Sequence, residues 1–108
     1  MPQVILTDQD NAYITNITNI ENKYNFSYFD DEKNYINIKT FDDGITLNKK
    51  AKDYELELNL RKDGFVKIIN CEGIMNFDIK VVDFILNNDN MLVRYLVEGQ
   101  EKKLEIKY

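Results

Sequence analysis

Apolar and polar residues alternate one by one through much of the chain, and this pattern constrains the fold more than any other sequence feature. In residues 55–60, ELELNL, three leucines fall on one face of an extended chain and three polar residues on the other. Successive side chains of a strand point to opposite faces, so this period of two predicts a half-buried β-strand. Residues 65–71, 75–86, 91–97 and 104–108 show related patterns, as do 23–29 and 34–41.

Turn signals separate these segments. Each glycine directly follows an acidic residue, in the pairs Asp43–Gly44, Asp63–Gly64, Glu72–Gly73 and Glu98–Gly99. Such pairs favour tight type I′ hairpin turns, whose central residues have positive φ. Within 75–86 the apolar residues change from odd to even positions after Val82, and the extra residue predicts a β-bulge or sharp bend near Val81–Val82.

The expected fold is all-β. About eight strands with short connections and no long helix predict a single domain over residues 1–108, built as a small antiparallel up-and-down β-barrel; an antiparallel β-sandwich is the alternative. Residues 12–20 are better read as strand than as helix, and the structure of 1–23 stays undecided. The expected interior comprises Leu56, Leu58, Leu60, Met75, Phe77, Ile79, Leu104 and Ile106.

Composition excludes several functions. The chain has no histidine and one cysteine, Cys71. Ser-His-Asp or Cys-His catalysis, an internal disulfide and a Cys-rich zinc site are therefore excluded for a single chain. We expect no enzyme, no cofactor and no metal site. Cys71, next to Glu72, is expected to be inert and partly buried, because a neighbouring carboxylate raises a thiol pKa.

Charge and hydropathy limit the partners. Nineteen acidic residues outnumber fourteen basic ones, for a net charge of -5, and the only basic cluster is the short run 49–52. This argues against nucleic acid, which requires a basic stripe. The apolar runs are too short to cross a membrane, and the N-terminal residues lack a signal-peptide pattern, so a cytoplasmic location is expected. Frequent Asn, Ile and Lys indicate a bacterium or phage with a low-GC genome.

Acidic clusters offer weak site candidates. Asp8, Asp10 and Asn11 suggest a calcium loop, but Ala12 and Tyr13 occupy the positions that need an oxygen ligand and glycine. The runs 30–32 and 42–43 contain paired carboxylates, which serve acid–base chemistry in some enzymes. Both runs fall at expected turns, where solvated acids are ordinary.

The strand 91–97 has two different faces. Met91, Val93, Tyr95 and Val97 form the richer apolar face and are expected to point inward. Arg94 then lies on the surface; the alternative is an inward guanidinium that clamps an anionic ligand. The outward residues, together with two from a neighbouring strand, are the expected protein contact: Leu92, Leu96, Arg94, Val66 and Ile68. A weak homodimer, or an N-terminal segment lying over this face, would cover it.

Residues 26–108 resemble the YwiB-like family of uncharacterised bacterial proteins. The similarity lies in FSYFDD at 26–31, EGIMNFDI at 72–79 and the closing hairpin of VRYLV at 93–97 with LEIKY at 104–108. The resemblance implies a calycin-like, or lipocalin-like, β-barrel and supplies no catalytic residue. This sequence differs in its shorter N-terminal part and in Asn70-Cys71-Glu72 before Gly73.

Two functions are compatible with the sequence. The first is a non-enzymatic barrel that binds a small apolar or amphipathic ligand, which rests on fold analogy. The alternative is a protein–protein interaction module or a self-associating structural protein. In a chain of this length we expect the thirteen aromatic side chains to fill the interior rather than to line a hollow.

Overall fold

The protein forms ten antiparallel strands in a computed structural model, which describes residues 2–8, 11–17 and 22–108. Their bounds are β1 Gln3–Asp8, β2 Asn11–Asn16, β3 Asn25–Phe29, β4 Tyr35–Phe41, β5 Gly44–Lys50, β6 Tyr54–Leu60, β7 Gly64–Asn70, β8 Gly73–Leu86, β9 Asn90–Val97 and β10 Gln100–Lys107. The all-β, antiparallel class is confirmed. The strand number exceeds the expected eight because β1 and β5 were not predicted as strands. The described part of the chain contains no helix able to span a membrane.

The strands form one sheet in the order β2-β1-β10-β9-β8-β7-β6-β5-β4-β3. From β3 to β10 each strand pairs with the next one in sequence, and β1 then pairs with β10. This confirms the up-and-down order. No pairing joins β2 to β3 within the described ranges, so the sheet curls without the hydrogen-bonded closure that the barrel prediction required.

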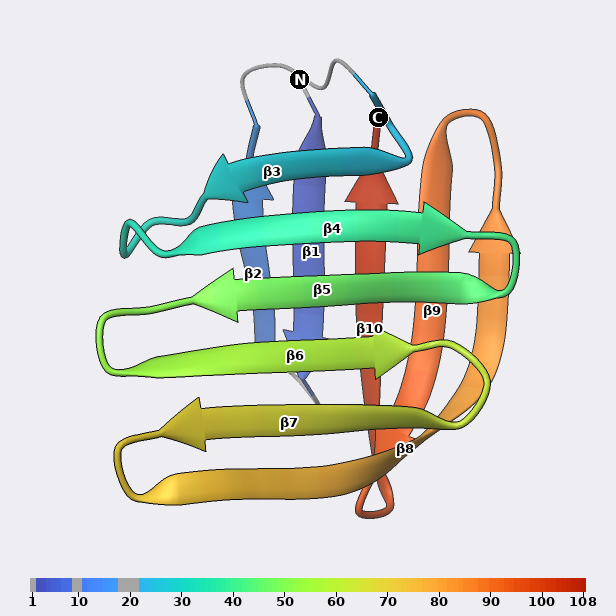
Figure 1. The fold of residues 1–108 in the computed structure, drawn as a ribbon. Helices are drawn as coiled ribbons and strands as arrows, with labels where there is room; N and C mark the ends of the chain where they lie inside the picture. The colour runs from blue at the N-terminus through green and yellow to red at the C-terminus, as the bar shows by residue number, and fades with distance from the viewer. Residues whose placement is uncertain (1, 9–10, 18–21) are drawn as a thin grey trace.

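The curled sheet has two facing layers (Figure 1). One layer contains β3 to β7 and the first part of β8; the other contains β2, β1, β10, β9 and the rest of β8, and its strands run across those of the first. The long strand β8 passes between the layers, and its register with β9 shifts between Val81 and Asp83. The bulge expected near Val81–Val82 is therefore confirmed, and it lies where one layer continues into the other.

The four acid–glycine pairs all lie at turns, but only one has the expected backbone. Glu98 and Gly99 both have positive φ, at 51° and 80°, as a type I′ turn requires. At Gly44 and Gly73 the glycine is instead the first residue of the returning strand. The glycine at 44 is required by space, because a Cβ there would lie 2.1 Å from the carbonyl oxygen of Leu60.

The core is unevenly packed. Five of the eight predicted interior residues are buried: Leu58, Leu60, Ile79, Leu104 and Ile106. Leu56 and Phe77 are half-buried, and Met75 is 48% exposed, so its prediction is wrong. Met75 does share a face with Ile68, its partner in register. However, the start of β8 projects past β2 in Figure 1, where no facing strand covers it.

We call the well-packed part of the interior the packed half. It consists of inward side chains with no exposed surface, from both layers: Ile38, Ile45, Leu60, Met91, Val93, Leu104 and Ile106. The inward prediction for Met91, Val93 and Tyr95 is thereby confirmed.

Candidate functional site

A cavity of about 640 Å³ lies between the layers, next to the packed half. Its apolar wall comes from both layers, with Leu47, Leu56, Leu58, Val66, Ile68 and Phe77 from one and Val4, Leu6, Tyr95 and Val97 from the other. We call this part of the interior the open half. The expectation that aromatic side chains fill the interior is therefore wrong: four of the thirteen, Tyr13, Tyr28, Phe77 and Tyr95, line a hollow instead.

Two tyrosines are the most buried polar side chains of this cavity. Tyr28 is 8% exposed and Tyr95 is 5% exposed, and both line the cavity. Neither hydroxyl makes a hydrogen bond with another described residue. Burial raises the pKa of Tyr28, with a further contribution from the Asp30 charge. Burial, helped by the Asp8 charge, raises the pKa of Tyr95 to about 12. Both hydroxyls are therefore neutral, and among the described residues neither has a hydrogen-bond partner that would compete with a polar ligand group.

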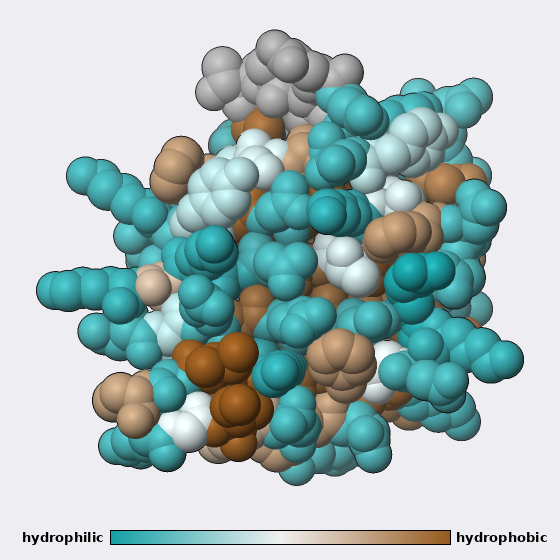
Figure 2. Space-filling model, in the orientation of Figure 1, coloured by the Kyte–Doolittle hydropathy of each residue, from teal (hydrophilic) through white to brown (hydrophobic). Residues whose placement is uncertain are grey.

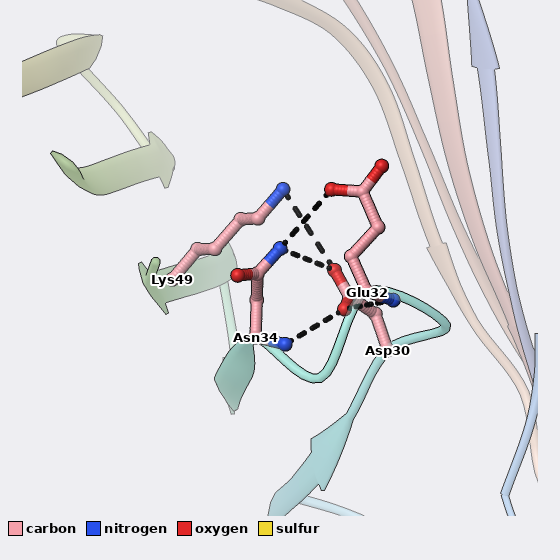
Figure 3. Close-up of polar contacts among 4 residues, drawn as sticks. All are labelled: Asp30, Glu32, Asn34 and Lys49. Carbon is pink, nitrogen blue, oxygen red and sulfur yellow. Dashed lines mark hydrogen bonds and ion pairs between the residues drawn. The ribbon is translucent and has the colours of Figure 1, made fainter. Parts of the chain in front are cut away.

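The rim of the cavity includes the tight turn between β3 and β4 (Figure 3). The Asp30 carboxylate accepts hydrogen bonds from the backbone N–H groups of Glu32 and Asn34, both at 2.9 Å, and from the Asn34 amide at 3.2 Å. Burial acts to raise the pKa of Asp30, but these bonds and the nearby Lys49 outweigh it, so the pKa is lowered. The charged Asp30 carboxylate therefore stabilises the turn and fixes the positions of Asp31 and Glu32 at the rim.

Lys49 extends from β5 toward this turn. In register it lies between Ile36 on β4 and Leu56 on β6, which places it on the inner face. Its Nζ is 3.8 Å from Asp30 Oδ2 and 5.5 Å from the centre of the Tyr54 ring. Burial acts to lower the pKa of Lys49; contacts with Tyr54, Asp30 and Glu32 outweigh it and raise the pKa. Lys49 is thus a charged, inward-facing side chain.

A second ion pair lies on the inner face of the other layer. Lys102 lines the cavity, and its Nζ is 3.3 Å from Asp8 Oδ2. Lys102 is also the register partner of both Asp8 and Tyr95. Both cavity lysines therefore have a carboxylate partner within the chain. Asp31 and Glu32, in contrast, make no ion pair with any residue that the structure describes.

The predicted contact residues are divided between two places. Leu92, Arg94 and Leu96 lie on the outer face of β9, as expected, and are half-buried. Val66 and Ile68 do not join them: they pair with Leu58 and Leu56 on the inner face and line the cavity. Placing them on the outer patch was wrong, because β7 is apolar on both faces and its alternation does not reveal which face is inward.

Arg94 is a surface residue. Its guanidinium pairs with Asp83 on β8 and lies 3.6 Å from Glu101 on β10. These contacts, led by the hydrogen bond to Asp83, raise the pKa of Arg94. The alternative of an inward anion clamp is therefore wrong. The N-terminal segment does not cover this face either, because β1 pairs edge to edge with β10 and extends the sheet.

The remaining sequence candidates stay apart from the cavity. Asp43 binds Arg61, with 2.8 Å between its Oδ1 and the Arg61 Nε. Cys71 is exposed at the β7–β8 turn rather than partly buried. Asp10, from the weak calcium motif, lies outside the described residues. Among the residues that are described, no cluster of three or more His, Cys, Asp or Glu is arranged to hold a metal.

Neither the cavity nor the inward position of Lys49 was predicted from the sequence. The alternation of Ile45, Leu47 and Lys49 contained the signal for the lysine, since all three share one parity and one face. The lysine was instead grouped with its basic neighbours along the chain. No comparable signal in the sequence indicated that the two layers would leave space between them.

No protein-family model matches this chain, and no curated protein matches it significantly. Among solved structures, the chain is similar to the ywiB protein from Bacillus subtilis, with 13% sequence identity and a TM-score of 0.38 over 97% of this chain and 84% of that chain. A likeness of this size does not assign the chain to a family, so the family resemblance remains a prediction.

Proposed function

We propose that this protein is a non-enzymatic binder of a small apolar or amphipathic molecule, held in the cavity between the layers. The observation that supports the proposal is the cavity itself: about 640 Å³, with an apolar wall and a few polar side chains. Small-molecule sites are typically concave and apolar, with a small number of polar groups that orient the ligand. The absence of histidine from the sequence favours binding over catalysis.

We also propose that the curled sheet is a calycin-like barrel and that the protein is located in the bacterial cytoplasm. Barrels of that kind enclose small ligands, which makes the fold analogy consistent with the cavity, although fold alone does not determine function.

The chain contains no tryptophan, so an introduced one serves both to fill the cavity and to report on it. Ile68 lines the cavity, whereas Ile69, its neighbour on β7, is exposed on the outer face. The neutral dye Nile red should bind the wild type and shift its emission to the blue. Ile68→Trp should weaken that binding by about tenfold or more, since a larger side chain occupies the site. Ile69→Trp is the matched control and should bind as the wild type does.

Equal dye binding by the two variants would overturn the proposal, as would absence of dye binding by the wild type. Thermal melting of both variants checks that each remains folded, so that a loss of binding reports on the cavity.

A second candidate function, self-association, is favoured by a row of apolar side chains across the outer face of the other layer. In register, Ile85 on β8 lies beside Leu92 on β9, and Ile5 on β1 lies beside the exposed Ile14 on β2; Glu105 on β10 lies between the two pairs. We propose that this row contacts a second copy of the chain, forming a weak homodimer. Sedimentation of the wild type and of Leu92→Glu/Leu96→Glu tests it: the wild type should dimerise at high concentration and the variant should not. A monomeric wild type would refute self-association.

A further inference from the structure

The rim of the cavity carries more negative than positive side chains. Three carboxylates and two ammonium groups line it: Asp30, Asp31, Glu32, Lys49 and Lys102. Lys49 is paired with Asp30 and Lys102 with Asp8. Among the described residues, the rim carboxylates without an ion pair are those of Asp31 and Glu32, so the excess charge that a ligand meets is negative. A concave site with apolar walls concentrates such a field and attracts ions of the opposite sign.

The buried part of the cavity also suits a cation. Tyr28 and Tyr95 are each more than nine-tenths buried, line the cavity and make no hydrogen bond with a described residue. A neutral tyrosine hydroxyl accepts a hydrogen bond from an N–H group through its oxygen lone pairs. Aromatic rings shielded from water attract cations through their negative faces. These two side chains are a second observation, independent of the acidic turn, that points to a ligand.

We propose that the ligand is an amphipathic cation, with an apolar body against the cavity wall and a protonated amine near the Asp31–Glu32 rim and the tyrosine hydroxyls. This inference rests on the proposed binding function and adds the charge of the head group. An anionic head group is disfavoured, because it would have to displace Asp30 or Asp8 from the lysines and approach Asp31 and Glu32, which make no ion pair with a described residue.

The test uses three ten-carbon probes with the same tail: decylammonium, decanoate and decanol. Their affinities are measured below the micelle concentration by displacement of Nile red at neutral pH and low salt. Decylammonium should bind about tenfold more tightly than decanoate, as expected from an excess of negative charge at a desolvated rim. The preference should fall as salt screens these exposed charges.

The charges are then removed in two matched variants. Asp31→Asn/Glu32→Gln should reduce the preference for decylammonium over decanoate to within about twofold, because the attracting charges are gone. Asp42→Asn/Asp89→Asn removes the same amount of charge at turns that do not line the cavity. This control should keep the full preference, which separates a local effect from the net charge of the protein.

The outcomes distinguish this inference from the proposed function. If decanol displaces the dye but decylammonium and decanoate bind equally, the cavity binds apolar molecules and the cationic head group is wrong. Tighter binding of decanoate would likewise overturn the inference and would indicate that Lys49 or Lys102 exchanges its partner. If none of the probes nor the dye binds, the proposed function itself fails.

Discussion

The packed half and the open half of the interior are built from the same strands, yet they differ in how completely the two layers meet. On β6, Leu60 is fully buried, Leu58 is nearly so, and Leu56 is half-buried beside the cavity. The three residues have the same side chain and the same face, so their chemistry does not explain the gradient. What changes along the strand is the coverage by the facing layer, because the start of β6 extends past β2, the last strand of that layer (Figure 1). One strand therefore supplies both stability and a binding site.

The largest expected difference between the halves is the loss of stability when a glycine is replaced by alanine. A Cβ at Gly44, beside the packed half, would overlap the carbonyl oxygen of Leu60, whereas a Cβ at Gly73, at the opposite ends of the strands, would meet no atom within 4 Å. Gly44→Ala should therefore destabilise the protein by more than about 3 kcal/mol, as backbone displacement does. Gly73→Ala should cost about 1 kcal/mol, which reflects only its positive φ of 141°.

Urea denaturation of the two variants measures this difference. Similar losses at the two positions would mean that the two ends of the sheet are equally rigid.

The next comparison uses large-to-small substitutions inside each half. Leu60→Ala removes a fully buried side chain and should cost about 3 kcal/mol. Ile68→Ala removes a half-buried side chain that already borders a cavity and should cost about 1 kcal/mol. Denaturant midpoints give both values. If Ile68→Ala were as costly as Leu60→Ala, the cavity would not exist in solution, and the proposed function would lose its basis.

The rim of the open half should show a pH-dependent contribution to stability. Asp30→Ala removes the acceptor for two backbone N–H groups and should cost about 1 kcal/mol at neutral pH. The folded-state pKa of Asp30 is lowered, so this contribution is complete above the ordinary aspartate pKa. It is lost as the pH falls through the lower folded value.

The difference in unfolding free energy between wild type and Asp30→Ala should therefore shrink in acid. Asp30→Asn is the control: it keeps a side-chain oxygen acceptor for the turn and should lose less than Asp30→Ala at neutral pH. A difference that grows on acidification would contradict the assigned role of this carboxylate.

The smallest effect is expected at Tyr95. Its hydroxyl makes no hydrogen bond with a described residue, so Tyr95→Phe should change the stability of the free protein by less than about 0.5 kcal/mol. Thermal or chemical denaturation provides the measurement. A loss of more than about 1 kcal/mol would show that the hydroxyl has a partner in the folded protein, and Tyr95 would then not be available to a ligand.

Local patterns predicted β3, β4, β6 to β10 and the bulge in β8, but not β5. The alternation also assigned the correct face to Leu58 and Leu60 on β6 and to Tyr95 on β9. These successes share a physical cause: a side-chain period of two is a property of the strand itself. It needs no knowledge of which strands face one another.

The errors arose where burial depends on distant parts of the chain. Met75 lies on the predicted face, but how far it is buried depends on the extent of the opposite layer, which does not reach it. Val66 and Ile68 belong to a strand with apolar residues on both faces, so only pairing with β6 reveals their direction. The cavity could not be predicted for the same reason, because it results from the separation of two layers and not from the pattern of any one segment.

The outer surface of the first layer contrasts with these interior walls (Figure 2). In the view of Figure 1 it is largely hydrophilic, apart from an apolar patch at the lower left. The exposed residues Ile69 and Ile74 pair across β7 and β8 on the outer face. The front of the molecule therefore presents little apolar area in competition with the cavity.

The pairing of β1 with β10 has a consequence for the folding kinetics. Every other neighbouring pair in the sheet joins strands that follow one another in sequence, whereas Gln3 must find Lys107 at the opposite end of the chain. Sequential hairpins form early because their loops are short, and a contact across the whole chain forms late because its loop-closure entropy is greatest. We therefore expect β3 to β10 to assemble first as a growing meander, with the β1–β2 hairpin docking last. Since β1 contributes Val4 and Leu6 to the cavity wall, the site would be completed only in that final step.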